Sequence, residues 1–220
     1  MARKTDRGAV PSARPNLPLG QGGDGTETAA WICSRQSTSP KLLAPPGPDE
    51  VELETMIRAA VSAPDHGRLR PWRFIRIADA GRDALGELFA DAKRRKDPDC
   101  SVADLERERD RAARAPGLVA VVACIDCNCD IPEHEQFISV GAAVQNLLLV
   151  AHAFGYGARL VSGIKTRDRL LCAALGLNAA EELVGFICIG TPVKLARHRN
   201  RPDPGDHLTV WSGLPGREER

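Results

Sequence analysis

Apolar residues recur at helical spacing over residues 49–61, between two proline-containing turns. Asp49 precedes the apolar positions and Glu52 follows three residues later, which is the spacing of a capping box at a helix N-terminus. Pro64 would end the helix. The pattern therefore predicts an amphipathic helix after Asp49. Its apolar face would consist of Leu53, Met56, Ile57, Ala60 and Val61.

Further helices and strands are predicted along the rest of the chain. Residues 72–77 alternate as a half-buried strand, and residues 117–125 form a continuous apolar strand. Thr166 is predicted to cap a helix that runs to Ala174. Further helices are predicted at 81–95 and 102–114, and further strands at 158–162 and 183–190.

The longest apolar helix is predicted over residues 133–154, where glycines at 155 and 157 end it. Such all-round apolarity is typical of a helix buried between layers or between subunits. Its apolar residues, which lie on more than one face, are Val140, Ala143, Val144, Leu147, Leu148, Val150 and Ala151.

The two ends of the chain differ from its middle. Residues 1–27 are rich in Gly, Pro, Ser and Arg and are predicted to form a disordered tail, after which a short helix runs through Trp31 and Ile32. Residues 192–220 are Pro-rich and basic, and are predicted to form an arm rather than a packed element. Helices come first and strands are scattered, which favours an α+β fold over regular βαβ winding.

Composition narrows the function classes. The chain has 220 residues, 30 basic and 29 acidic, so nothing indicates bulk attraction to nucleic acid or to an anionic membrane. The basic N-terminus lacks the apolar region of a secretory signal, and no stretch reaches the roughly 18–20 apolar residues of a membrane span. The seven cysteines are therefore expected to be reduced thiols in a cytoplasmic protein.

Three polar segments could carry chemistry. Arg35-Gln36-Ser37 offers a planar fork of donors and a hydroxyl, which suit a phosphate, although a solvated loop would look the same. Residues 62–72 form a rigid polar turn that contains Ser62 and His66; a hydrolase is disfavoured because no serine has a nucleophile-elbow pattern around it. The glycines in residues 155–163 would let backbone approach a flat ligand, or serve a simple strand edge.

In order and spacing, these segments resemble the FMN-dependent nitroreductase family, especially its shortest members. The resemblance covers residues 28–212, and its motifs are weak singly. They are Arg35-Gln36-Ser37, Ala63-Pro64-Asp65-His66, Pro71-Trp72-Arg73-Phe74, Ser139-Val140-Gly141-Ala142, a Gly-x-Gly strand that ends in Ser162-Gly163, and Val184-Gly185-Phe186 with Ile189-Gly190-Thr191-Pro192.

The resemblance implies a role for particular residues. Arg35, Gln36 and Ser37 would hold the FMN phosphate and part of the flavin edge. Ser62 and His66 would face flavin bound by the partner subunit. Leu160, Val161 and Ser162 would line the other side of the flavin. Many family members also bind the phosphate through a basic pair on the C-terminal arm, for which Arg199 and Arg201 are the candidates.

The resemblance also implies a fold and an activity. The fold would be a central mixed or antiparallel sheet flanked by helices, in a homodimer with FMN at its interface, and residues 213–220 would be a C-terminal tail. NAD(P)H would reduce the flavin, which would then reduce a small acceptor such as a nitroaromatic or a quinone. No catalytic acid or base is assigned, because the cofactor does the redox chemistry.

The sequence departs from the family pattern at two places, and two other functions remain open. Asp65, His66 and Arg68 replace small polar residues of larger family members, and the insertion that roofs their active sites is limited here to residues 93–116; both leave the substrate class open. The chain could instead be a flavin-binding sensor without turnover. It could also be a zinc-binding interaction module, since Cys124, Cys127 and Cys129 lie within six residues; metal is disfavoured because no second CxxC exists.

Overall fold

The computed structural model describes residues 24–194, 200–211 and 213. The chain divides into two units, of which the first ends at Ser34 and the second begins at Arg35. The first unit contains α1 (Gly25–Ser34), which includes the helix predicted through Trp31 and Ile32 and has no buried residue. Of the tail predicted at 1–27, residues 1–23 lie outside the described residues, whereas residues 25–27 form the first turn of α1, so helical structure begins earlier than predicted.

The second unit is built on one antiparallel sheet, in which β5 is the longest strand. One edge of β5 pairs with β3, which in turn pairs with β2. The other edge of β5 pairs first with β4 and then, near its C-terminal end, with β1. The five strands are β1 (Leu43–Ala44), β2 (Trp72–Arg76), β3 (Gly117–Cys124), β4 (Gly157–Val161) and β5 (Glu181–Pro192).

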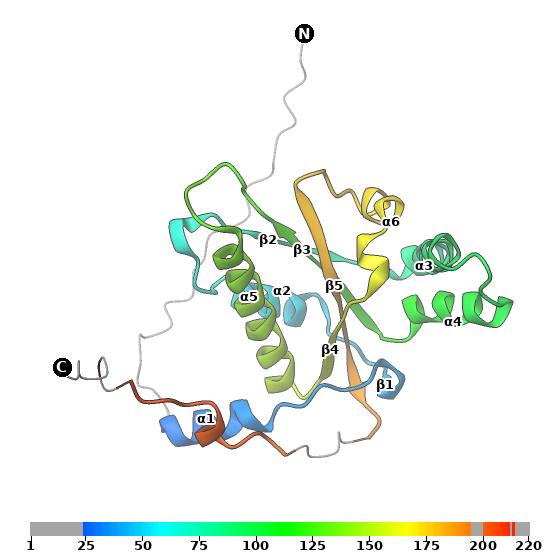
Figure 1. The fold of residues 1–220 in the computed structure, drawn as a ribbon. Coiled ribbons are helices and arrows are strands. Elements are labelled where there is room, and N and C mark those ends of the chain that lie inside the picture. The colour runs from blue at the N-terminus through cyan, green and yellow to red at the C-terminus, as the bar shows by residue number, and fades with distance from the viewer. Residues whose placement is uncertain (1–23, 195–199, 212, 214–220) are drawn as a thin grey trace, which may run out of the picture. The chain divides into compact units, whose positions relative to one another are not determined.

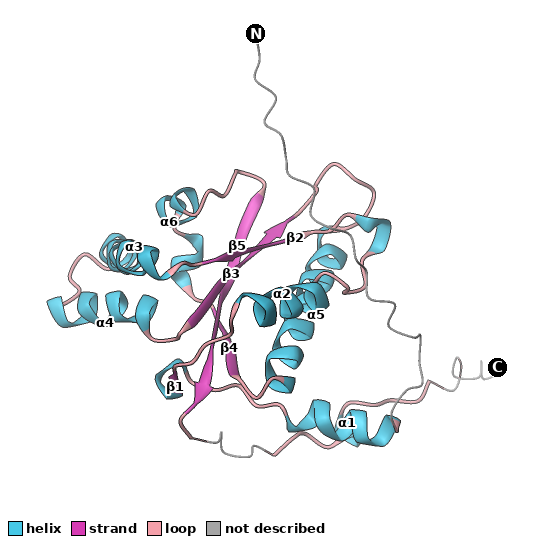
Figure 2. Cartoon of the chain, turned by 180° about the vertical axis from the view of Figure 1, so that it is seen from behind, coloured by secondary structure: helices cyan, strands magenta, loops and turns pink. Residues whose placement is uncertain are grey.

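Helices cover both faces of this sheet, as Figures 1 and 2 show. The expected α+β fold with an antiparallel sheet is therefore confirmed. On one face α2 packs with α5, and on the other face α3 and α4 lie together with α6 nearby. The helices of this unit are α2 (Glu50–Ala60), α3 (Arg82–Lys96), α4 (Val102–Ala113), α5 (Glu133–Ala153) and α6 (Arg169–Ala174).

Strand β3 explains why the core has two halves. Successive side chains of a strand point to opposite faces, so Val119 and Val121 pack in the cluster under α2 and α5. Leu118 and Ala120 pack in the cluster under α3, α4 and α6. Because both faces are covered, the strand is apolar at every position, as its sequence indicated.

Helix α2 begins as predicted. Asp49 Oδ1 accepts a hydrogen bond from the Glu52 backbone N–H at 2.8 Å, and Glu52 Oε2 accepts one from the Asp49 N–H at 3.0 Å. Met56 and Ala60 are buried. Val61, which was expected on the same apolar face, is 48% exposed, because it is the C-cap residue, where the chain turns away from the helix.

Helix α5 has eight buried residues, most of which belong to the core cluster between this helix and the sheet. By length and composition alone it could cross a membrane, with a mean hydropathy of 1.3 over 18 residues, although polar residues such as Gln145 and Asn146 interrupt its apolar sequence. About 44% of that window is buried. Ile138, in contrast, remains 68% exposed. Core packing thus accounts for one side of α5 and leaves an apolar residue on the other.

The start of α6 differs from the sequence prediction. Asp168 caps this helix, since its Oδ1 accepts from the Leu171 N–H at 2.9 Å. Thr166 lies instead in the preceding 3₁₀ turn, η4 (Ile164–Arg167), and its hydroxyl donates to Gly163 O. Arg95 of α3, a residue outside this helix, donates hydrogen bonds to both carboxylate oxygens of Asp168 and fixes its position. This contact between distant segments selects the cap.

An ion pair should make the stability of the fold depend on acid pH. Arg73 of β2 donates Nε and Nη2 to the two carboxylate oxygens of Glu181 at the start of β5, both at 2.8 Å. This pairing lowers the pKa of Glu181 to about 2 from 4.5. A carboxyl whose folded pKa is depressed stabilises the fold above its unfolded pKa, and this contribution is lost as pH falls from 4.5 towards 2.

Urea unfolding between pH 7 and pH 2.5 tests this expectation. The wild-type free energy of unfolding should fall across that acid window. Glu181→Gln should be less stable at pH 7 and should show a flatter fall, because it cannot lose the charge. Equal pH slopes for the two proteins would show that Glu181 does not contribute to acid lability.

Candidate functional site

The segment Arg35-Gln36-Ser37 lies beside the start of β4. Ser37 forms a parallel bridge with Ala158, and the Thr38 N–H donates to Ala158 O at 3.2 Å. Ser162 follows Ala158 by four residues, which is about 13 Å of extended strand. The structure therefore brings two predicted groups together along one strand, with Arg35, Gln36 and Ser37 at its start and Leu160, Val161 and Ser162 at its end.

Arg35 and Gln36 carry buried donors without a partner. Arg35 Nε and Gln36 Nε2 are both inaccessible to solvent and make no hydrogen bond. Buried polar groups are paired in nearly all proteins, and an unpaired one costs the free energy of its lost hydration. Two such donors on neighbouring residues are therefore suited to an acceptor that no residue described by the structure supplies.

Positive charge gathers at the same place. Arg201 Nη2 donates to the backbone oxygen of Arg35 at 2.5 Å. Burial lowers the pKa of Arg35, and the charge of Arg201 lowers it further. Burial and the nearby Arg35 likewise lower the pKa of His152, in the last turn of α5. Burial and the proximity of other positive charges account for all three effects, and we call Arg35 and Arg201, together with the neighbouring His152, the cationic cluster.

Of the two arm residues considered for this role, Arg201 reaches Arg35, whereas Arg199 lies outside the described residues. His152 was missed from the sequence. The signal that could have found it is its position, since it is the lone ionisable residue between Glu135 and Tyr156 on an apolar segment.

The far end of β4 presents both faces of the strand. Leu160 packs on the core cluster under α2 and α5, whereas Val161 packs on the opposite cluster. Ser162 is exposed, and the chain turns sharply at Gly163, whose φ of 141° favours glycine. The three predicted residues therefore offer two half-buried side chains and a hydroxyl at a strand end.

Ser62 and His66 lie elsewhere. The Ser62 hydroxyl donates to Ala59 O, and His66 Nδ1 is 2.8 Å from Glu135 Oε2 in the first turn of α5. Glu135 and His152 are 17 residues apart on a helix that rises 1.5 Å per residue, or roughly 25 Å. One chain therefore places His66 at the end of α5 opposite to the cationic cluster, whereas Ser62 lies nearer the middle of α5, since Ala59 O also accepts a hydrogen bond from Asn146.

A pocket with a small cavity of about 50 Å³ opens beside Val161 and Ser162. One wall is Lys165, whose ammonium lies 4.0 Å from the ring centroid of Phe89 and 2.7 Å from Glu108 Oε2. The side chains of Lys165 and Glu108 are 15% and 13% exposed. This ion pair joins α4 to the turn that follows β4.

Removing one partner of this pair should destabilise the protein. Glu108→Ala would leave the mostly buried Lys165 without its anion, and such losses typically cost about 3–5 kcal/mol. Glu108→Gln keeps an acceptor and should cost less. Equilibrium denaturation of both variants checks this, and a loss below about 0.5 kcal/mol for Glu108→Ala would contradict it.

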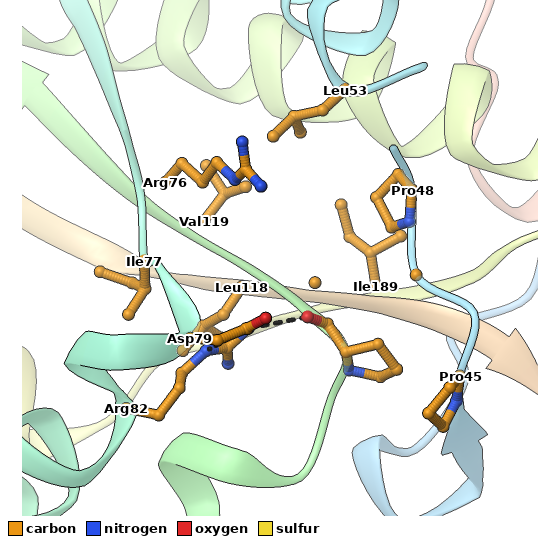
Figure 3. Close-up of a pocket in the computed structure, with 13 residues that line it drawn as sticks. Pro45, Pro48, Leu53, Arg76, Ile77, Asp79, Arg82, Leu118, Val119 and Ile189 are labelled. Atoms are coloured by element: carbon orange, nitrogen blue, oxygen red, sulfur yellow. Dashed lines mark hydrogen bonds and ion pairs between the residues drawn. The ribbon is translucent and has the colours of Figure 1, made fainter. Parts of the chain in front are cut away.

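A larger cavity, of about 360 Å³, lies apart from these residues (Figure 3). Arg76, one of its two cations, pairs with Glu50 at 3.0 Å. Arg82, the other, donates to Ala112 O and Pro116 O and lies 3.8 Å from Asp79. Charges in and around this cavity balance, and no predicted site residue lines it. Arg82 is best explained by its contacts to the segment between α4 and β3.

The three neighbouring cysteines do not converge. The Cys124 thiol donates to Glu181, the Cys127 thiol to Glu133, and the Cys129 thiol to backbone oxygens. Within the part of the chain that the structure describes, no group of three or more His, Cys, Asp or Glu residues could hold a metal ion.

Comparisons with known proteins agree with this geometry. The Nitroreductase family profile matches residues 32–191. "Putative NAD(P)H nitroreductase YdjA" of Escherichia coli (strain K12) is 32% identical over 82% of this chain and 97% of its own length. A nitroreductase-like family protein from Bacillus cereus has a similar fold, with a TM-score of 0.72, 21% identity and coverage of 84% of this chain and 96% of its own. A putative nitroreductase from Desulfovibrio desulfuricans in complex with FMN gives a TM-score of 0.63 at 23% identity, over 85% and 97% of the two chains.

Proposed function

The chain belongs to the nitroreductase family, and on this premise we propose that it is an FMN-dependent oxidoreductase that takes hydride from NAD(P)H. The electrons pass to a small acceptor, such as a nitroaromatic or a quinone. Residues 28–212 would form the FMN-binding domain, with tails at 1–27 and 213–220. The relative YdjA is named for NAD(P)H, and the solved relative from Desulfovibrio desulfuricans holds FMN, which supports both assignments.

The observation that carries the proposal is the pair of buried, unpartnered donors on Arg35, in the cationic cluster, and on the adjacent Gln36. A phosphate monoester offers three acceptor oxygens and about two negative charges, which match the guanidinium of Arg35, the amide of Gln36 and the charge of Arg201. The Ser37 hydroxyl is a further donor on the same segment. The residues present therefore fit the phosphate of FMN.

The strand β4 would orient the ring system. Leu160, Val161 and Ser162 follow the phosphate residues at about 7–13 Å along an extended strand, and their backbone and side chains would form one wall for a flat ligand. When bound, FMN supplies the redox chemistry, and the protein supplies binding, orientation and electrostatics. We assign no residue of this chain as a catalytic acid or base.

The second wall would come from another copy of the chain. His66, through its contact with Glu135, is separated from the cationic cluster by roughly 25 Å of α5, which is more than one flavin nucleotide spans, and Ser62 precedes it on the same loop. In a two-fold dimer, which is the commonest assembly of identical chains, they would contact FMN held by the partner. This arrangement accounts for both groups of predicted residues.

Steady-state assays with the purified protein test the activity. We expect NADH or NADPH oxidation that depends on a nitroaromatic or quinone acceptor, disappears when FMN is stripped and returns when FMN is added. A fully flavinated protein that oxidises neither donor with any acceptor would instead be a flavin-binding protein without turnover. A colourless protein with stoichiometric zinc would support the metal-binding alternative.

A further inference from the structure

The loop that carries His66 has an unusual backbone. Gly67, Arg68 and Arg70 have φ angles of 72°, 58° and 52°, in the left-handed region. Residues other than glycine are uncommon there, and such conformations cluster at functional sites, where surrounding contacts hold them. The loop after α2 therefore adopts a conformation that its own sequence does not favour.

Contacts from two sides hold this loop. Asp65 Oδ2 accepts a hydrogen bond from the Arg70 N–H at 2.7 Å, which closes the loop on itself. A Cβ on Gly67 would come within 2.3 Å of Ile131 Cδ1, so the segment before α5 packs directly against the backbone. Because the loop is held at both points, the position of His66 is defined.

Glu135 defines the orientation of the imidazole. Its Oε2 lies 2.8 Å from His66 Nδ1, although the two residues are 69 positions apart. An ionised carboxylate can only accept hydrogen bonds, so the shared proton resides on Nδ1. In the neutral imidazole, Nε2 is then the acceptor. The His66 side chain is 67% exposed, which leaves this face available for contact.

We propose that Glu135 is a positioning residue, which holds His66 with Nδ1 protonated and Nε2 directed outward as a hydrogen-bond acceptor for FMN on the partner subunit. The contact with FMN rests on the proposed function, whereas the orientation of His66 rests on the geometry alone. A polar contact between exposed side chains contributes little to stability, so orientation is the property that this hydrogen bond provides.

Nitrogen-15 NMR of the full-length, flavin-loaded protein tests the orientation, because the two neutral histidine tautomers have distinct ring nitrogen shifts. His66→Asn identifies the His66 signals among those of the five histidines. Wild-type His66 should be the Nδ1–H tautomer, and Glu135→Ala should shift it towards the Nε2–H form that predominates in water. Glu133→Ala, on the same turn but paired with Cys127, is the matched control and should change nothing.

The FMN dissociation constant gives the second readout. Glu135→Ala should raise it about two- to tenfold, the worth of one ordinary hydrogen bond. The increase should vanish when His66→Asn is already present, because Glu135 acts through His66. Glu133→Ala should leave FMN affinity unchanged.

Unchanged His66 tautomers in Glu135→Ala would overturn the proposal. So would an equal loss of FMN affinity with and without His66, since this would show a general structural effect. Wild-type protein that binds no FMN would refute the proposed function instead, and the tautomer comparison would still decide the role of Glu135.

Discussion

Replacing Arg35 with alanine should weaken FMN binding by roughly ten- to a hundredfold or more. A hydrogen bond to a charged group typically contributes about 1.5–3 kcal/mol, and a guanidinium can supply two to one phosphate. Arg35 carries the buried, unpartnered Nε of the cationic cluster, so the loss should fall on the ligand. Titrating deflavinated protein with FMN and following the quenching of flavin fluorescence measures the effect.

Two further variants make this result specific. Arg35→Lys keeps the charge but loses the planar fork, so its affinity should fall between those of the wild type and Arg35→Ala. Arg94→Ala removes the same charge from the surface of α3, where Arg94 pairs with Asp91, and should bind FMN normally. Wild-type affinity in Arg35→Ala would remove the phosphate assignment.

Truncation after residue 204 should separate the flavin-loaded protein into monomers and release most of its FMN. Leu208, Val210 and Trp211 are 74%, 83% and 80% exposed in the single chain, and Ile138 of α5 is also exposed. Three exposed apolar residues within four positions of one segment favour an interface there, since contiguous exposed apolar surface often marks one. Obligate dimers often bury about 2,000–5,000 Å², and a ligand that contacts both chains stabilises them further.

Light scattering at micromolar concentration distinguishes the two assemblies. The full-length holoprotein should have the mass of two chains, and the truncated protein the mass of one. Leu208→Ser with Trp211→Ser should act in the same direction as the truncation. Leu170→Ser, which alters an exposed leucine on α6, should not. A fully flavinated full-length monomer would refute the shared site.

Local patterns predicted most of the elements. The capping box at Asp49 is contained within four residues, and β3 is apolar because both of its faces are covered, so both could be identified from nearby sequence. The cap of α6 could not, since Thr166 and Asp168 are both suitable residues and Arg95, 73 positions away, decides between them. Strand β1 has two residues, which is too short for any periodicity.

The candidate site was predictable only in part. Arg35, Gln36 and Ser37 were identified because their spacing from later motifs resembles a family, and the structure then places them beside β4. Glu135 and His66 are 69 positions apart in the sequence, and their contact depends on how the loop after α2 folds against α5. No local sequence pattern therefore indicates it. Likewise, His152 becomes relevant only when Arg35 packs near it.

Anaerobic reduction of the purified holoprotein tests the central claim most directly. The protein should contain one FMN per chain, and its flavin absorbance should bleach when NADH or NADPH is added and recover when a quinone or nitroaromatic follows. The FMN-depleted protein should oxidise neither donor. Flavin that stays oxidised with both donors, or a purified protein that neither contains nor takes up FMN, would contradict the proposed function.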